Sequence, residues 1–197
     1  DPELGIVAFQ ALDGRPIAVM GNFSMHYYGD KAISADYFGL FCDGIESHAR
    51  SQNPNATGVV GIMSHGCSGD IWRRDYATWK SGDQDPTIER YTQGLLDIAK
   101  AAYDSIEYHE VAELAMAETR LKMNYRVPDA QRLKWATEMV DEMGDQLPKD
   151  RPQVYAREQV LLHQMQDTEV VVQAIRIGDI GIATTPNETY ALTGLKV

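Results

Sequence analysis

Residues 58–70 have the sequence GVVGIMSHGCSGD, in which a short apolar run leads into a loop of small and polar residues. The apolar part, 58–63, has the length and composition of a buried β-strand. The part that follows, 64–70, is rich in residues that let the backbone approach a ligand closely and offer N–H groups to it. Loops at strand ends are where α/β folds place their functional sites. This stretch therefore indicates the fold class and a first candidate site.

Strands and helices alternate on both sides of this stretch. Before it, the sequence predicts a β-hairpin at 5–12 and 16–25 around the turn Asp13-Gly14. A helix that begins near Ser34 is expected next, with an apolar stripe of Phe38, Phe41, Ile45 and Ala49. After it, the expected elements are a helix at 87–108, an extended segment at 111–126, a helix at 128–143, a second hairpin at 169–185 and a helix at 187–196. The prediction is an α/β fold, with a mixed β-sheet flanked by helices.

Composition excludes several kinds of partner. A net charge of −11 argues against nucleic acid, because a phosphate backbone is bound by a basic face. It also argues against anionic membrane surfaces. No apolar run approaches the length of a transmembrane helix. Cys42 and Cys67 are too few for a disulfide framework, and we interpret both as buried free thiols.

Two strand-end loops carry side chains that could bind a metal. His26 follows the second predicted strand, where an imidazole could serve as a metal ligand or base, or simply hydrogen-bond at the loop edge. Glu188 follows Pro186 at a predicted helix start, where an acidic residue also suits the helix dipole. A carboxylate would suit a divalent cation that also carries histidines and an open position. The pattern is compatible with a catalytic metal site.

The loop at 64–70 allows more than one interpretation. Ser68 between Cys67 and Gly69 could be a nucleophile, but the surrounding sequence is not Gly-x-Ser-x-Gly, and a tight turn explains it equally well. The run Arg73-Arg74-Asp75-Tyr76 could clamp an anionic substrate group, although we interpret it as a surface loop.

Four short motifs, taken in order, resemble the neutral/alkaline ceramidase family and its bacterial relatives. They are NFSMH at 22–26, ISADYFG at 33–39, CSGDI at 67–71 and TPNE at 185–188. The resemblance implies that His26 and Glu188 are zinc ligands and that zinc is the cofactor. It also implies catalytic roles for Asp70 and His65, and substrate contacts by Ser68, Gly69, Trp72 and Asp36.

The resemblance further implies that residues 1–197 form part of a larger catalytic domain. The family's other zinc histidine would lie upstream and its zinc-binding tyrosine downstream, so that this chain alone would hold an incomplete zinc site and be inactive. Relatives are often exported, which favours a periplasmic or extracellular location.

The expected activity is zinc-dependent hydrolysis of an amide bond in a small-molecule or lipid-like N-acyl substrate. One departure from the family bears on this expectation. Ceramidases have Gly-Asp-Val-Ser-Pro-Asn, whereas here Gly69-Asp70-Ile71 is followed by Trp72. This puts ceramide itself in doubt as substrate. Two alternatives remain open, an ester hydrolase on the same scaffold and a non-catalytic carbohydrate- or lipid-binding relative, which Trp72 favours.

Overall fold

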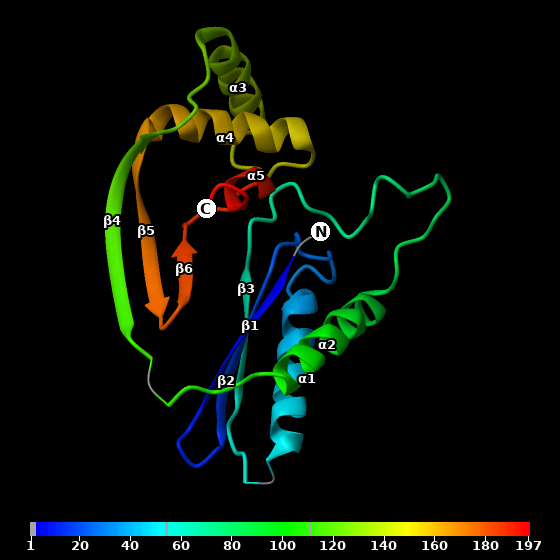
Figure 1. The fold of residues 1–197 in the computed structure, drawn as a ribbon. Coiled ribbons are helices and arrows are strands. Elements are labelled where there is room, and N and C mark those ends of the chain that lie inside the picture. Colours follow the sequence, from blue (N-terminus) through cyan, green and yellow to red (C-terminus); the bar gives the residue numbers. More distant parts are fainter. Residues whose placement is uncertain (1–2, 54, 111) are drawn as a thin grey trace. The chain divides into compact units, whose positions relative to one another are not determined.

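The chain forms two compact units (Figure 1). The computed structural model describes residues 3–53, 55–110 and 112–197. The first unit comprises Asp1–Ala112 together with Asn187–Val197, and the second comprises Glu113–Pro186. The candidate site residues all belong to the first unit.

The sheet of the first unit contains β1 (Leu4–Gln10), β2 (Pro16–Phe23) and β3 (Val60–His65), in that order. β1 pairs with β2 antiparallel and β2 pairs with β3 parallel, which confirms the predicted mixed sheet. Phe23 at the end of β2 is the register partner of His65 at the end of β3. The loops that follow these two strands therefore start at the same edge of the sheet.

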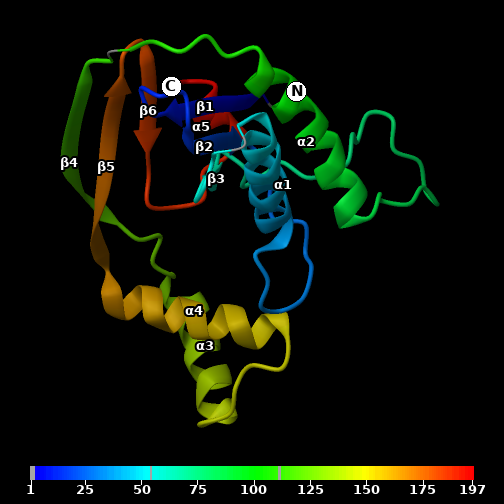
Figure 2. The same ribbon diagram turned by 90° about the horizontal axis from the view of Figure 1, so that it is seen from below.

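Helices α1 (Asp36–Gln52) and α2 (Ile88–Asp104) pack against each other and against this sheet (Figures 1 and 2). The buried residues of α1 recur at every fourth position, as a helix with one core-facing stripe requires. They are Tyr37, Phe41, Ile45 and Ala49. Leu95, Leu96 and Ala99 of α2 and Val19 and Phe23 of β2 belong to the same core.

The second unit contains an antiparallel sheet and a helical hairpin. The sheet has the order β4 (Leu114–Asn124), β5 (Asp167–Ile177) and β6 (Ile180–Thr184). Helices α3 (Ala130–Met143) and α4 (Arg151–Met165) pack together, and Ala136 and Ala156 are buried. The predicted second hairpin is therefore present, but it forms a separate sheet with β4.

Two helices differ from the sequence prediction. The pattern did not predict α4, because its apolar residues are spread around the helix rather than gathered in one stripe. Its start does carry a signal, since Asp150 caps the helix and Pro152 lies in the first turn. The helix predicted at 187–196 shortens to α5 (Ala191–Gly194), because Glu188–Tyr190 have no regular secondary structure and the helix begins only after Tyr190, whose backbone is extended.

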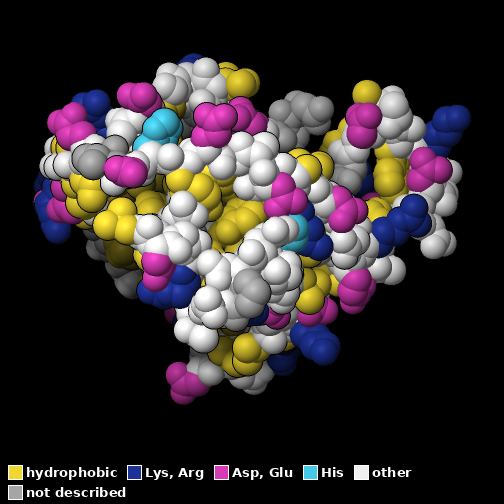
Figure 3. Space-filling model, turned by 60° about the horizontal axis from the view of Figure 1, so that its bottom comes forward, with side chains coloured by type: hydrophobic (Ala, Val, Ile, Leu, Met, Phe, Trp, Pro, Cys, Tyr) yellow, Lys and Arg dark blue, Asp and Glu magenta, His cyan; other side chains and the backbone are white. Residues whose placement is uncertain are grey.

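Charged side chains of both signs are mixed over the surface that Figure 3 draws, and hydrophobic side chains are exposed between them. Among the described residues, no helix combines the length and the hydrophobicity that crossing a bilayer would require.

Candidate functional site

The loop after β3 is hydrogen-bonded to the segment that carries Glu188. Each residue of the sequence 67–70 makes one hydrogen bond to the segment 188–191. The hydroxyl of Thr189 donates to Cys67 Sγ (3.1 Å), Ser68 Oγ to Glu188 Oε1 (3.4 Å), the Gly69 N–H to the Thr189 carbonyl (2.9 Å) and the Ala191 N–H to Asp70 Oδ1 (2.8 Å). The loop thereby positions Glu188 beside the loop that follows β2.

Gly69 makes this close approach possible. A Cβ atom at this position would lie 2.6 Å from the ring of Tyr190. Gly69 and Asp70 were predicted from the resemblance as a substrate-binding and a catalytic residue. The contacts that the structure gives them are to the segment 188–191, and a role toward substrate stays a prediction.

His26 and Glu188 face each other across the edge of the sheet. Their nearest atoms, His26 Nε2 and Glu188 Oε1, are 3.7 Å apart, and their side chains are 25% and 45% exposed. The other ring nitrogen, His26 Nδ1, lies 3.2 Å from the carbonyl oxygen of Tyr27. Since a carbonyl can only accept, Nδ1 carries the proton of this hydrogen bond. In the neutral ring, Nε2 then presents a lone pair to a carboxylate, and a proton, a bridging water or a cation between the two atoms would make this arrangement favourable.

The donor pair fits part of a zinc site. Two protein ligands on one tetrahedral zinc ion, with bonds of ~2.0–2.2 Å, would be about 3.3–3.6 Å apart, close to the observed separation. A backbone carbonyl that holds the second ring nitrogen is the usual support of a metal-binding histidine. Within the described residues, however, no group of three or more His, Cys, Asp or Glu side chains is arranged to hold a metal ion. A role of His26 and Glu188 as zinc ligands therefore stays a prediction.

His65 and Ser68 lie next to this pair. His65 Nε2 is 2.8 Å from the carbonyl oxygen of Met25 and 2.6 Å from Ser68 Oγ. The edge of the His65 ring meets Phe38 with 5.2 Å between the ring centroids. Ser68 has no exposed surface, so its hydroxyl interacts with protein groups.

Trp72 lies beside His26, with 5.3 Å between their ring centroids. Its other neighbour is Arg73, whose guanidinium stacks between the rings of Trp72 (4.2 Å) and Tyr28 (4.3 Å). Arg73 also donates to the Tyr28 carbonyl at 2.9 Å and pairs with Asp85 at 2.8 Å, and its side chain is only 15% exposed. Arg73 lies in a loop, as interpreted from the sequence, but its side chain is packed rather than exposed. The aromatic residue directly before it was the signal in the sequence.

Asp36, predicted as a substrate-binding residue, organises the loop after β2. Its carboxylate accepts from the backbone N–H groups of Tyr28 (2.6 Å), Gly29 (2.8 Å), Asp30 (3.0 Å) and Tyr37 (2.8 Å). Burial alone would raise the pKa of Asp36, but these N–H groups outweigh it and hold the pKa below its ordinary value of 3.8. The geometry supports a structural role, and a contact with substrate stays a prediction.

The lowered pKa of Asp36 predicts a contribution to acid stability. The contribution is complete above the ordinary pKa of 3.8 and is lost as the pH falls through the lower pKa of the folded state. Asp36→Asn is therefore expected to destabilise the chain at neutral pH, and its deficit relative to the wild type should shrink below about pH 4. Urea unfolding from pH 6 to pH 3 measures this difference. Asp43→Asn, on the same helix, controls for removal of a charge. A deficit that is independent of pH would contradict the assignment.

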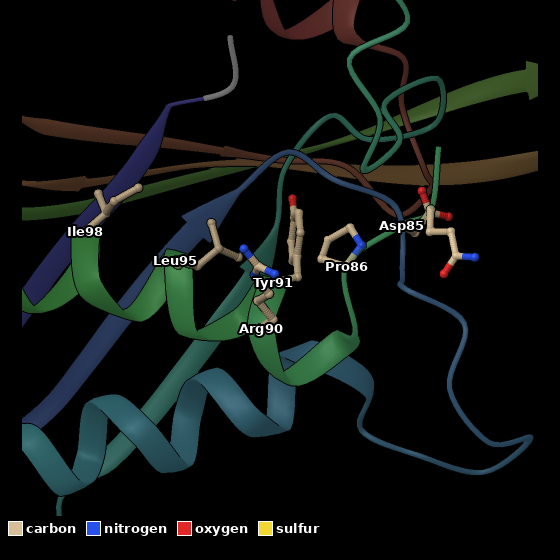
Figure 4. A pocket seen from close by; sticks show the side chains of 8 residues that line it. Asp85, Pro86, Arg90, Tyr91, Leu95 and Ile98 are labelled. Atoms are coloured by element: carbon tan, nitrogen blue, oxygen red, sulfur yellow. The ribbon is translucent and has the colours of Figure 1, made fainter. Parts of the chain in front are cut away.

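A separate open hollow of about 750 Å³ runs along α2 (Figure 4). It is lined by Gln84, Asp85, Pro86, Arg90, Tyr91, Gly94, Leu95 and Ile98. None of the predicted site residues lines it. Asp85 connects the two regions, because it pairs with Arg73, which stacks on Trp72.

Comparisons with known proteins bear on the fold. No family model matches the chain, and no curated protein matches it. Among solved structures, the neutral ceramidase from Pseudomonas aeruginosa is similar over 100% of this chain, with a TM-score of 0.58 and 16% sequence identity. The fold of this chain is similar to that of the matching part of the ceramidase. The chain spans 36% of the length of that ceramidase, and at this identity the likeness shows the fold alone.

Proposed function

We propose that this chain is the central part of a zinc-dependent hydrolase that cleaves an amide bond in an N-acyl, ceramide-like substrate. The observation that carries the proposal is the His26–Glu188 pair, in which the imidazole nitrogen and the carboxylate oxygen lie 3.7 Å apart while the Tyr27 carbonyl holds the other ring nitrogen. The ceramidase-like fold supports it, since the pair lies at the end of parallel strands, where such folds place their sites.

His26 and Glu188 would supply two of the zinc ligands, and we propose that further donors lie in segments outside residues 1–197. Bound zinc would polarise the substrate carbonyl and lower the pKa of a bound water. The residues of this chain orient the two ligands: the Tyr27 carbonyl sets the His26 ring, and the loop at 67–70 sets Glu188.

Asp70 is the best candidate for orienting the water or the leaving amine. Its Oδ1 accepts from the Ala191 N–H, and within the described residues its Oδ2 has no hydrogen bond. Asp70 is also exposed, so a reacting group can reach it. We propose this role for Asp70.

A binding function without catalysis is the alternative proposal. Ceramidases have a serine where this chain has Trp72, and the Trp72 ring lies beside His26. An aromatic ring at this place could stack on a sugar or an acyl group. The two proposals differ in whether bound substrate is turned over.

Zinc content and turnover of the full-length protein that contains this chain test the proposal. We expect near-stoichiometric zinc and release of fatty acid from N-acyl substrates, including a short-chain ceramide. His26→Ala and Glu188→Ala should each remove most of the zinc and lower kcat/KM at least ~100-fold, because each removes a ligand. His48→Ala is the matched control. His48 on α1 pairs with Asp104 on α2 at 2.7 Å and does not contact His26 or Glu188.

A well-folded protein that binds no zinc would contradict the hydrolase proposal. Retained substrate binding without turnover, in a protein that holds no zinc, would favour the alternative.

A further inference from the structure

The proton on His65 can be placed from its contacts. The carbonyl oxygen of Met25 lies 2.8 Å from His65 Nε2 and also accepts from the buried hydroxyl of Tyr37 at 3.1 Å. A carbonyl has no proton to donate. His65 Nε2 must therefore carry the proton, which excludes this nitrogen as a general base in the folded chain.

The proton on His65 Nε2 determines the direction in which the Ser68 hydroxyl donates. Ser68 Oγ lies 2.6 Å from the same nitrogen, so it faces an N–H and shares it as a second acceptor with Met25. The proton of the hydroxyl then points elsewhere. The remaining neighbour is Glu188 Oε1 at 3.4 Å, and an ionised carboxylate can only accept. Because Ser68 is fully buried, bulk water does not compete for this proton.

The oxygen that receives this proton is the one that faces His26. Glu188 Oε1 is the near atom in both contacts, at 3.4 Å from Ser68 Oγ and 3.7 Å from His26 Nε2. The Glu188 side chain is 45% exposed and projects from a segment without regular secondary structure, so no helix or strand orients it. A fixed donor behind the carboxylate would supply that orientation, as the outer partners of metal ligands commonly do.

We propose that His65 and Ser68 form a positioning relay, in which His65 Nε2–H sets the Ser68 hydroxyl and Ser68 donates to Glu188 Oε1, so that the carboxylate faces His26. The relay rests on the proposed function only in that Glu188 is taken as a metal ligand. His65 and Ser68 are thus positioning residues, which replaces the catalytic role predicted for His65 and the substrate contact predicted for Ser68.

The hydrogen-bond part of the relay is tested without metal. Long-range ¹H–¹⁵N NMR spectra of the metal-free 197-residue chain report which nitrogen of His65 is protonated. We expect the proton on Nε2, where the Met25 carbonyl and Ser68 Oγ accept it. A ring that carries its proton on Nδ1 alone would overturn the relay, whatever the chain does with zinc.

The positioning part is tested by the zinc affinity of the full-length protein. Ser68→Ala is expected to weaken zinc binding about 10–100-fold. Ser64→Ala is the matched control, because the Ser64 hydroxyl bonds to Asn22 and the Gly21 carbonyl rather than to Glu188, and it should leave the affinity unchanged. An unchanged affinity in Ser68→Ala would overturn the proposal.

A double-mutant cycle separates a relay from two independent effects. His65→Leu should weaken zinc binding as Ser68→Ala does, whereas His65→Gln keeps an N–H donor and should recover part of the loss. The double variant His65→Leu/Ser68→Ala should lose little more than either single variant, because both act on one hydrogen bond. Fully additive losses would overturn the relay. If the wild-type protein binds no zinc, the proposed function fails, and the NMR result still decides the relay.

Discussion

Replacement of Phe41 by alanine is expected to lower the free energy of unfolding by about 3–5 kcal/mol. Phe41 lies on α1 with no exposed surface, and its ring comes within 2.9 Å of the place that a Cβ on Gly21 would occupy. The ring therefore fills the space directly over β2. Alanine would lose the transfer free energy of the ring and leave a cavity that the helix and the sheet cannot close. Denaturant unfolding monitored by circular dichroism measures the loss.

Leu40 provides the matched control for Phe41. It is the preceding residue of the same helix and is 40% exposed. Leu40→Ala should cost less than about 1 kcal/mol, because little apolar surface is buried there and no cavity forms. Equal losses in the two variants would show that α1 does not pack on the sheet through the stripe that contains Phe41.

The second large effect is expected at Gly61, where β3 crosses α1. A Cβ atom on Gly61 would lie 2.8 Å from the carbonyl oxygen and 3.0 Å from the Cα of Cys42. Both are backbone atoms of a helix, so they cannot rotate away as a side chain could. Gly61→Ala should therefore lower the free energy of unfolding by about 2–3 kcal/mol through overpacking. Since β3 leads directly to His65, the variant should also weaken any zinc binding at the site.

Gly5→Ala is the control for this substitution. Gly5 lies on β1 of the same sheet, and a Cβ there would have no atom within 4 Å. Alanine should leave the stability unchanged or raise it slightly, because it restricts the unfolded chain. Thermal unfolding of both variants provides the comparison, and a loss at Gly5 as large as that at Gly61 would refute the steric argument.

Local patterns predicted most of the secondary structure of the first unit. The apolar run at 58–63 becomes β3 with its boundaries moved to Val60–His65, and the turn Asp13-Gly14 joins β1 to β2. The stripe predicted for α1 contained Phe38, whereas the structure buries Tyr37 together with Phe41 and Ile45. A helical period determines the face only to within about one residue, since neighbouring positions are only ~100° apart on the helix.

The separation of the two sheets could not be predicted in this way. The hairpin of β5 and β6 pairs with β4 through β5. Thr119 of β4 lies opposite Val172 of β5, so the paired residues are more than fifty positions apart in the chain. Alternation shows that a segment is a strand and which side chains share a face, but the same pattern suits any partner strand. The sequence pattern therefore predicted the strands but not the sheet to which each strand belongs.

The sequence by itself determined which loops carry the candidate site, because strand ends and small polar residues are visible locally. It placed His26 after the second strand, Ser68 and its neighbours after the third, and Glu188 at the start of the last predicted helix. Only the tertiary structure decided what these residues do to one another. The hydrogen bonds from Ser68 to Glu188 and from Thr189 to Cys67 span 120 and 122 positions of the chain. Which atom carries a proton depends on the acceptor that lies near it. Contacts over such separations depend on how the whole first unit packs rather than on any local pattern.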